Sequence, residues 1–199
     1  MRKEHFRRKV MKNCSKNYNW SLKCYLIIFI SKGTIIGVKK EVNCMNIQKF
    51  TQKSIEAINN CEKIAYDYGN QEIDQEHFLY SLMTIEDSLI ANLIEKMNID
   101  KDIFLKNIEQ LLNQKNKVSG DVKLYISNDL NKVLVNAEDE AKRMGDSYVS
   151  VEHLMLALIA APNRAIKQLF KTYGINRESF LSVLATVRGN QTVTSDNPE

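Results

Sequence analysis

The sequence predicts an all-α protein of two tandem four-helix repeats, about eight helices, packed with pseudo-twofold symmetry. Residues 50–112 overlay residues 126–188 without a gap at an offset of 76 and share 12 identities in 63 pairs. Average residue usage would give roughly 4 identities by chance. Apolar residues recur at helical spacing in both copies. A glycine that can end a helix follows the first apolar stretch at the same place in each copy, Gly69 and Gly145.

The identities fall where a packed helical unit needs them. Most other apolar positions pair apolar with apolar, so the copies share a burial pattern and therefore a fold. The identical pairs include Ala65 with Ala141, Glu76-His77 with Glu152-His153, Leu82 with Leu158, Leu93 with Leu169, and Phe104-Leu105 with Phe180-Leu181.

The first helix of each copy is expected over residues 55–65 and 130–144. A short connection then ends in Asp74 or Ser150, both good N-cap residues. In the following turn, Glu76 or Glu152 would stabilise the positive end of the helix dipole.

Three further helices complete each repeat. We expect them over 78–83, 89–97 and 103–112 in the first copy, and over 154–159, 165–173 and 180–187 in the second. The resulting domain spans 45–188, with repeat one at 45–113 and repeat two at 123–188. A chain of this length buries about 68% of its extended surface, enough for a core without metal or disulfide.

The two ends of the chain differ from this domain. Residues 1–44 carry 11 Lys/Arg and 2 Asp/Glu, whereas residues 45–199 carry 17 and 22, so the basic pI of 8.8 belongs to the leader. The apolar run 24–30 is too short to span a membrane, and no secretory cleavage site follows it. Residues 189–199 are polar and aperiodic, as in a linker toward a missing module.

We interpret residues 1–44 as a non-native, disordered leader. Lys40-Glu41-Val42 can be encoded as AAG-GAG-GTN, a purine-rich ribosome-binding sequence just upstream of the codon for Met45. Synthesis is then expected to start at Met45. Cys61 is the one cysteine beyond the leader, so no intramolecular disulfide is expected and the predicted compartment is the reducing cytoplasm.

Catalytic motifs are missing from the sequence. It has no G-x-x-x-x-G-K-[ST] loop and no nucleophile elbow, and beyond residue 45 it has no H-E-x-x-H and no cysteine pair. We therefore expect no catalytic residue, no metal and no enzymatic activity. The acidic balance of residues 45–199 argues against a nucleic-acid partner.

The duplicated Glu-His pair is the polar constellation that invites a functional hypothesis. In a local interpretation, His77 and His153 hydrogen-bond at the helix starts and the glutamates stabilise the dipole. In a functional interpretation, Glu76 and Glu152 lie at a surface where a carboxylate can hold a guanidinium by a bidentate pair. The two are compatible.

These residues resemble the Clp N-terminal repeat domain of AAA+ unfoldases. The resemblance covers residues 45–199, and the tail is similar to the segment leading into the first ATPase module of ClpB-type disaggregases. The motifs are Phe50-Thr51, Ile73-Asp74-Gln75-Glu76-His77-Phe78-Leu79, Val149-Ser150-Val151-Glu152-His153-Leu154-Met155, Val187-Arg188-Gly189-Asn190-Gln191, Val193-Thr194 and Asn197-Pro198-Glu199.

The resemblance implies an all-helical module that binds unfolded or aggregated polypeptide and delivers it to an ATPase ring. By this resemblance, Thr51, Asp146 and Glu152 match the family positions that take part in substrate handling. ClpC-type relatives instead read phosphoarginine or dock adaptor proteins. That alternative assigns guanidinium contacts to Glu76 and Glu152 and hydroxyl positions to Thr51 and Ser127.

Several expectations follow for the whole protein. ATP and magnesium would act in missing modules, with no cofactor in this chain, and an Hsp70-type system would cooperate. The isolated domain would be a cytoplasmic monomer with no membrane partner. Three functions are considered, in decreasing order of preference: a substrate-docking module of a disaggregase, a phosphoarginine reader or adaptor dock, and an unrecognised enzyme.

Overall fold

The computed structural model describes residues 47–118, 123–189, 192–194 and 196, and within them it confirms the all-α fold of eight helices. The expected leader, part of the connection between the repeats and most of the C-terminal linker lie outside the described residues. Repeat one holds α3 (Gln52–Asp67), α4 (Gln75–Thr84), α5 (Leu89–Lys96) and α6 (Lys101–Gln114). Repeat two holds α7 (Asn128–Met144), α8 (Val151–Ala160), α9 (Arg164–Tyr173) and α10 (Arg177–Arg188). A 3-10 turn, η2 (Ile47–Lys49), and two short strands, β1 (Glu72–Ile73) and β2 (Tyr125–Ile126), complete the described elements.

The helix boundaries follow local capping chemistry. Asp74 and Ser150 are the N-caps of α4 and α8, as predicted, and Gly145 ends α7 with a φ of 75°. Gly69, at a φ of 69°, lies just beyond the C-cap of α3. Both glycines adopt the left-handed conformation that costs other residues a steric penalty.

Several helices begin earlier than the sequence predicted. The second helices start at Gln75 and Val151 rather than at residues 78 and 154, and the fourth helices start at Lys101 and Arg177 rather than at 103 and 180. Apolar spacing marks the buried stripe of a helix, whereas the N-cap sets its start.

The backbones of the two repeats pair at two places that are related by the pseudo-twofold symmetry. Ile73 of β1 pairs in parallel with Ile126 of β2, and Phe50 pairs in parallel with Val149. Phe50 is equivalent to Ile126 and Ile73 to Val149 by the offset of 76 residues, so each pairing is the image of the other. The segment before the first helix of each repeat therefore lies beside the segment before the second helix of the other repeat.

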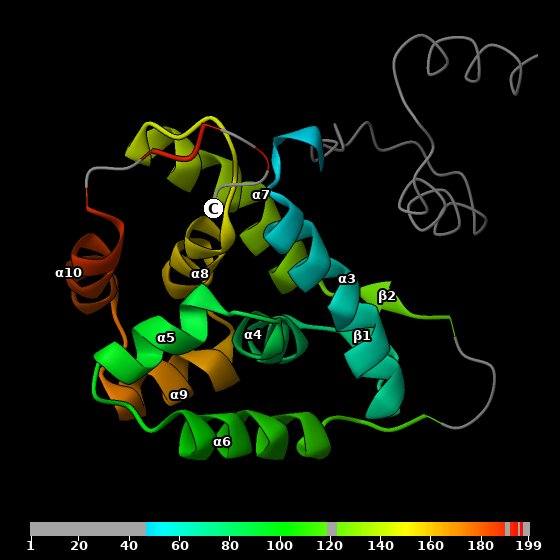
Figure 1. Ribbon diagram of the computed structural model, residues 1–199. Coiled ribbons are helices and arrows are strands. Elements are labelled where there is room, and N and C mark those ends of the chain that lie inside the picture. The colour runs from blue at the N-terminus through cyan, green and yellow to red at the C-terminus, as the bar shows by residue number, and fades with distance from the viewer. Residues whose placement is uncertain (1–46, 119–122, 190–191, 195, 197–199) are drawn as a thin grey trace, which may run out of the picture. The chain divides into compact units, whose positions relative to one another are not determined.

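The core is centred on α4 and α8 (Figure 1). Eight residues of each of these helices are buried. Helix α4 packs against α3, α5 and α6 of its own repeat and also against α7, α8 and α9 of repeat two. Cys61 is buried in this core and its thiol donates to the Ala57 carbonyl oxygen at 3.2 Å. Within the part of the chain that the structure describes, no helix is long and apolar enough to cross a membrane.

Candidate functional site

The candidate site residues gather in two pseudo-equivalent clusters at the N-terminal ends of α8 and α4. Cluster A contains Asp146, Glu152, His153 and Arg188, and we include Thr51 because its backbone pairs with Val149 just before α8. Cluster B contains Asn70, Asp74, Glu76, His77, Lys115 and Ser127. In cluster B the Ser127 hydroxyl of repeat two contacts the Asp74 carboxylate of repeat one, whereas the Thr51 hydroxyl bonds Ser54 of its own helix. The cross-repeat backbone pairing brings the two repeats together at both clusters: Thr51 N–H donates to the Val149 carbonyl oxygen at 3.0 Å, and Ser127 N–H to that of Ile73 at 2.9 Å.

The two histidines close capping boxes, as the local interpretation predicted. Nδ1 of His77 accepts from the Asp74 N–H at 3.0 Å, and Nδ1 of His153 accepts from the Ser150 N–H at 3.0 Å. An accepting Nδ1 places the proton of a neutral imidazole on Nε2. Nε2 of His77 therefore donates to Asn70 Oδ1 at 3.0 Å, and Nε2 of His153 donates to Asp146 Oδ2 at 2.8 Å.

Asp146 is the centre of cluster A. Its fully buried carboxylate accepts from His153, from the Arg188 guanidinium and, at 2.7 Å, from the Val193 N–H. The guanidinium of Arg188 also lies 3.6 Å from Glu152 Oε1. One arginine at the end of α10 thus links the two acidic residues singled out in the sequence.

Cluster B places a lysine where cluster A has an arginine. Lys115 Nζ lies 2.8 Å from both Asp74 Oδ2 and Glu76 Oε2. Glu76 Oε1 accepts from the Asn163 side-chain amide at 2.9 Å, and Ser127 Oγ donates to Asp74 Oδ1 at 2.7 Å. Glu76 and Glu152 are therefore both buried and paired with cations of the chain itself.

Burial and these ion pairs shift the pKa values of the histidines and aspartates in both clusters. Burial and the nearby Lys115 charge lower the pKa of His77 to about 4, and burial lowers the pKa of His153 despite the carboxylates beside it. For Asp146, burial acts to raise the pKa, but the hydrogen bonds from Arg188 and Val193 outweigh it and the pKa is lowered. The same balance, with Lys115 and Ser127 as donors, lowers the pKa of Asp74. Both histidines are neutral and both aspartates ionised near neutral pH.

The two hydroxyl residues of the clusters cap helices. Thr51 and Ser127 accept from backbone N–H groups at the starts of α3 and α7 as N-caps, and Thr51 Oγ1 donates to Ser54 Oγ at 3.0 Å. Over the ranges that the structure describes, no three or more His, Cys, Asp or Glu side chains form a group able to hold a metal ion.

Sequence reasoning missed the partners of the predicted residues. Arg188 is the last residue of α10 and Lys115 directly follows α6, so both are far from the acidic residues in sequence. Helical periodicity carries no signal for such a contact. Asn70 could have been found, because it is the repeat-one equivalent of Asp146.

A groove between α6 and α9 provides an open surface next to cluster B. Its volume is about 520 Å³. Leu111, Ala165 and Leu169 give it an apolar floor, and its rim carries side-chain amides and a hydroxyl: Asn107, Gln110, Gln114, Gln168 and Thr172. Gln114 and Arg164 at one end of the groove directly adjoin Lys115 and Asn163, the partners of Glu76. The pseudo-equivalent helices α10 and α5 pack directly against each other.

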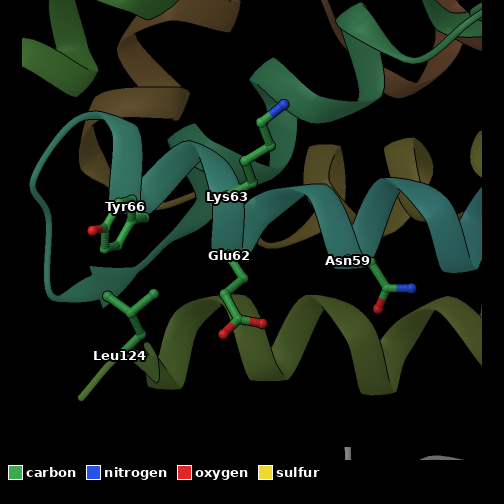
Figure 2. Close-up of a pocket in the computed structure, with 5 residues that line it drawn as sticks. All are labelled: Asn59, Glu62, Lys63, Tyr66 and Leu124. Atoms are coloured by element: carbon green, nitrogen blue, oxygen red, sulfur yellow. The ribbon is translucent and has the colours of Figure 1, made fainter. Parts of the chain in front are cut away.

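A second, shallower hollow of about 350 Å³ lies on the outer face of α3. Figure 2 shows Tyr66, from the last turn of α3, beside Leu124 from the segment that leads into α7. Asn59, Glu62 and Lys63 complete its lining. Tyr66 is 78% exposed, so this hollow is a surface feature rather than an enclosed site.

Comparisons with known proteins point to one family. Residues 49–173 match the model of the Clp repeat N-terminal domain. The chaperone proteins ClpB of Bacillus anthracis and Clostridium tetani are each 38% identical over 159 residues, which cover 78% of this chain and 18% of the relative. The chain thus spans less than a fifth of the length of these relatives.

Solved structures share the fold at lower identity. The N-terminal domain of Hsp104 from Candida albicans superposes with a TM-score of 0.64 at 23% identity, covering 74% of this chain and 97% of that one. The N-domain of ClpV, solved in complex with a VipB peptide, superposes with a TM-score of 0.59 at 16% identity, covering 81% and 99%.

Proposed function

The chain belongs to the Clp repeat N-terminal domain family, and on this premise we propose that it is the polypeptide-binding domain of a ClpB-type disaggregase. In this role it binds unfolded or aggregated protein and delivers it to an ATPase ring. The ring, its ATP and magnesium, and an Hsp70-type partner belong to the proposed whole protein, which acts in the cytoplasm. The domain itself acts as a monomeric binding module.

The observation that carries the proposal is the groove between α6 and α9. Its apolar floor can bury aliphatic side chains, each methylene contributing about 0.8 kcal/mol. Its amide rim can donate to and accept from a peptide backbone, whose N–H and C=O groups are the same in every sequence. Such a groove favours weak binding of many sequences, which suits a domain that must release its substrate to the ring.

The family-derived residues Thr51, Asp146 and Glu152 stay assigned to substrate handling in this proposal. They lie in cluster A, whereas the groove adjoins cluster B. Substrate would therefore meet the domain at two places.

Reading of phosphoarginine remains the second candidate, and one contact favours it. Glu152 lies 3.6 Å from the guanidinium of Arg188, so this carboxylate is already placed to pair with a guanidinium. An external guanidinium would have to replace Arg188, and at Glu76 it would have to replace Lys115. Loss of phosphoarginine binding in a folded Glu76→Ala, Glu152→Ala double variant would support this candidate.

An NMR titration of the chain with a permanently unfolded, apolar-rich polypeptide tests the main proposal. We expect saturable shifts at the groove residues Leu111, Ala165 and Gln168. Ala165→Glu should weaken binding at least tenfold, because it places a charge on the apolar floor. Ala185→Glu makes the same change at an exposed position of α10 and should leave binding unchanged. Equal binding by both variants would contradict the groove as the site.

A further inference from the structure

After α10 the chain returns to cluster A, where residues 192–194 (red in Figure 1) run past Asp146 and Val193 makes the contacts described next. The Val193 N–H donates to Asp146 Oδ1 at 2.7 Å. Its carbonyl oxygen accepts from the Ser147 N–H at 3.0 Å and from the Tyr148 N–H at 3.3 Å. Both backbone groups of a single residue are therefore bound by the segment Asp146–Tyr148, which we call the clamp.

The side chain of Val193 is bound as well. It is 6% exposed, whereas the neighbouring Thr192 and Thr194 are exposed. Within the described residues, Val193 is buried without belonging to the contiguous hydrophobic core. The side chain of Val193 is therefore shielded from solvent outside the main hydrophobic core.

Repeat one shows which part of this arrangement is common to the fold. Lys117 is the equivalent of Val193 and likewise returns to its own repeat, where it pairs with Asn70. The side chain of Lys117 is exposed, and the place of Asp146 is taken by Asn70, whose side-chain amide donates to the Asn116 carbonyl oxygen at 3.2 Å. The return of the chain is thus a property of the fold, whereas the carboxylate and the buried aliphatic side chain are particular to repeat two.

We propose that the clamp is a binding site for one residue of an extended peptide with a β-branched aliphatic side chain. Val193 is its intramolecular occupant, and an external polypeptide segment of the same chemistry replaces it. This inference rests on the proposed function, since it names a substrate class for cluster A. The contacts of Asp146 and of Ser147–Tyr148 bind the peptide backbone, and the buried position of the Val193 side chain favours an aliphatic side chain there.

The attachment of the strap, residues 192–194, fits such an exchange. It follows Gly189, which has a φ of 58°, so the chain leaves α10 at a residue whose conformation is separate from the helix. The described contacts that hold it are those of Val193, together with the bond from Gln52 N–H to the Asp196 carbonyl oxygen at 2.9 Å. On release, Asp146 keeps its ion pair with Arg188 and its bond from His153, so the clamp stays ionised and positioned.

A competition experiment on the full chain tests the proposal. The probe is a fluorescent peptide with the sequence of residues 190–196, Asn-Gln-Thr-Val-Thr-Ser-Asp. Val193→Asp should release the strap, because it places a carboxylate beside Asp146, and should raise the affinity for the probe at least tenfold over the unmodified chain. Thr194→Asp adds the same charge at an exposed neighbour and should behave like the unmodified chain. A probe with aspartate in place of its valine should not bind.

Two outcomes would overturn the inference: no gain of affinity in a folded Val193→Asp chain, or equal binding of the valine and aspartate probes. If Val193→Asp does not fold, the unmodified chain decides the matter, because excess probe must then shift the Ser147 and Tyr148 amide resonances. The proposed function fails separately, when unfolded polypeptide does not bind at the α6–α9 groove whatever the probe does.

Discussion

At the scale of single residues, the two histidines stabilise the fold because they are neutral. Each imidazole accepts a backbone N–H at Nδ1 and donates from Nε2, so a second proton would remove the acceptor that closes the capping box. Both repeats have this capping box, and the repeated Glu-His pair in the sequence indicates a local hydrogen bond of the histidine at each helix start.

Acidification should therefore destabilise the protein. The pKa of His77 is about 4 in the folded chain and about 6.5 when unfolded, so the unfolded state binds more protons between these values. Stability that is present at pH 7 is then lost as the pH falls, and His77 alone contributes a loss of about 2 kcal/mol by pH 5. His153 shifts in the same direction and adds to the loss. Urea unfolding at pH 7 and pH 5 measures the difference.

A His77→Gln variant provides the control for this pH dependence. Glutamine does not titrate, so the variant should be less stable at pH 7 but should lose about 2 kcal/mol less than the parent between pH 7 and pH 5. An unchanged pH slope in the variant would show that His77 is not the source.

Asp146 should be the costliest of the predicted site residues to neutralise. Asp146→Asn leaves the largely buried Arg188 guanidinium with Glu152 at 3.6 Å as its carboxylate partner. Weakening a buried pair from one side costs about 2–4 kcal/mol. Asp139→Asn, at an exposed aspartate on α7, should leave stability nearly unchanged, because solvent screens its ion pair with Lys142. Thermal unfolding of both variants at pH 7 compares them, and similar stabilities would contradict the burial argument.

At the scale of helices, the existence and order of the elements could be predicted, whereas their first turns and their partners could not. Capping residues such as Asp74 and Ser150 were legible in the sequence, and the structure confirms them. The strands β1 and β2 have two residues each, too short for any periodic pattern. The pairing of Glu76 with Lys115 depends on where the chain runs after α6, which only tertiary packing decides.

One carboxylate joins two helices of repeat two. Glu140 of α7 is buried, and it lies 2.7 Å from Arg143 and 2.7 Å from Arg177 of α10. Glu140→Gln should destabilise the protein by about 1–3 kcal/mol, because both charge-assisted hydrogen bonds are weakened in a buried position. Glu138→Gln, on the same helix but partly exposed, is the matched control and should cost less than about 0.5 kcal/mol. Chemical denaturation gives both values, and an equal effect of the two changes would count against the link.

At the scale of the whole molecule, the two repeats interlock and do not simply follow each other. In each parallel pairing, a segment of one repeat bonds to a segment of the other. In addition, α4 packs on α7, α8 and α9, and α5 packs on α8 and α10. A duplicated gene segment therefore encodes one shared core. The symmetry is not complete, because α6 and α9 line a groove whereas their equivalents, α10 and α5, pack directly against each other.

The shared core predicts that the repeats unfold together. Leu82 of α4 and its equivalent Leu158 of α8 are both fully buried, so replacing either with alanine should cost about 2–5 kcal/mol. Because the core is common, each change should lower amide protection in both repeats equally, as hydrogen exchange measured by NMR would show. If Leu158→Ala instead loosened repeat two and left repeat one protected at the level of the parent, the repeats would be separate folding units. The parallel pairings between the repeats would then contribute little to the stability of the domain.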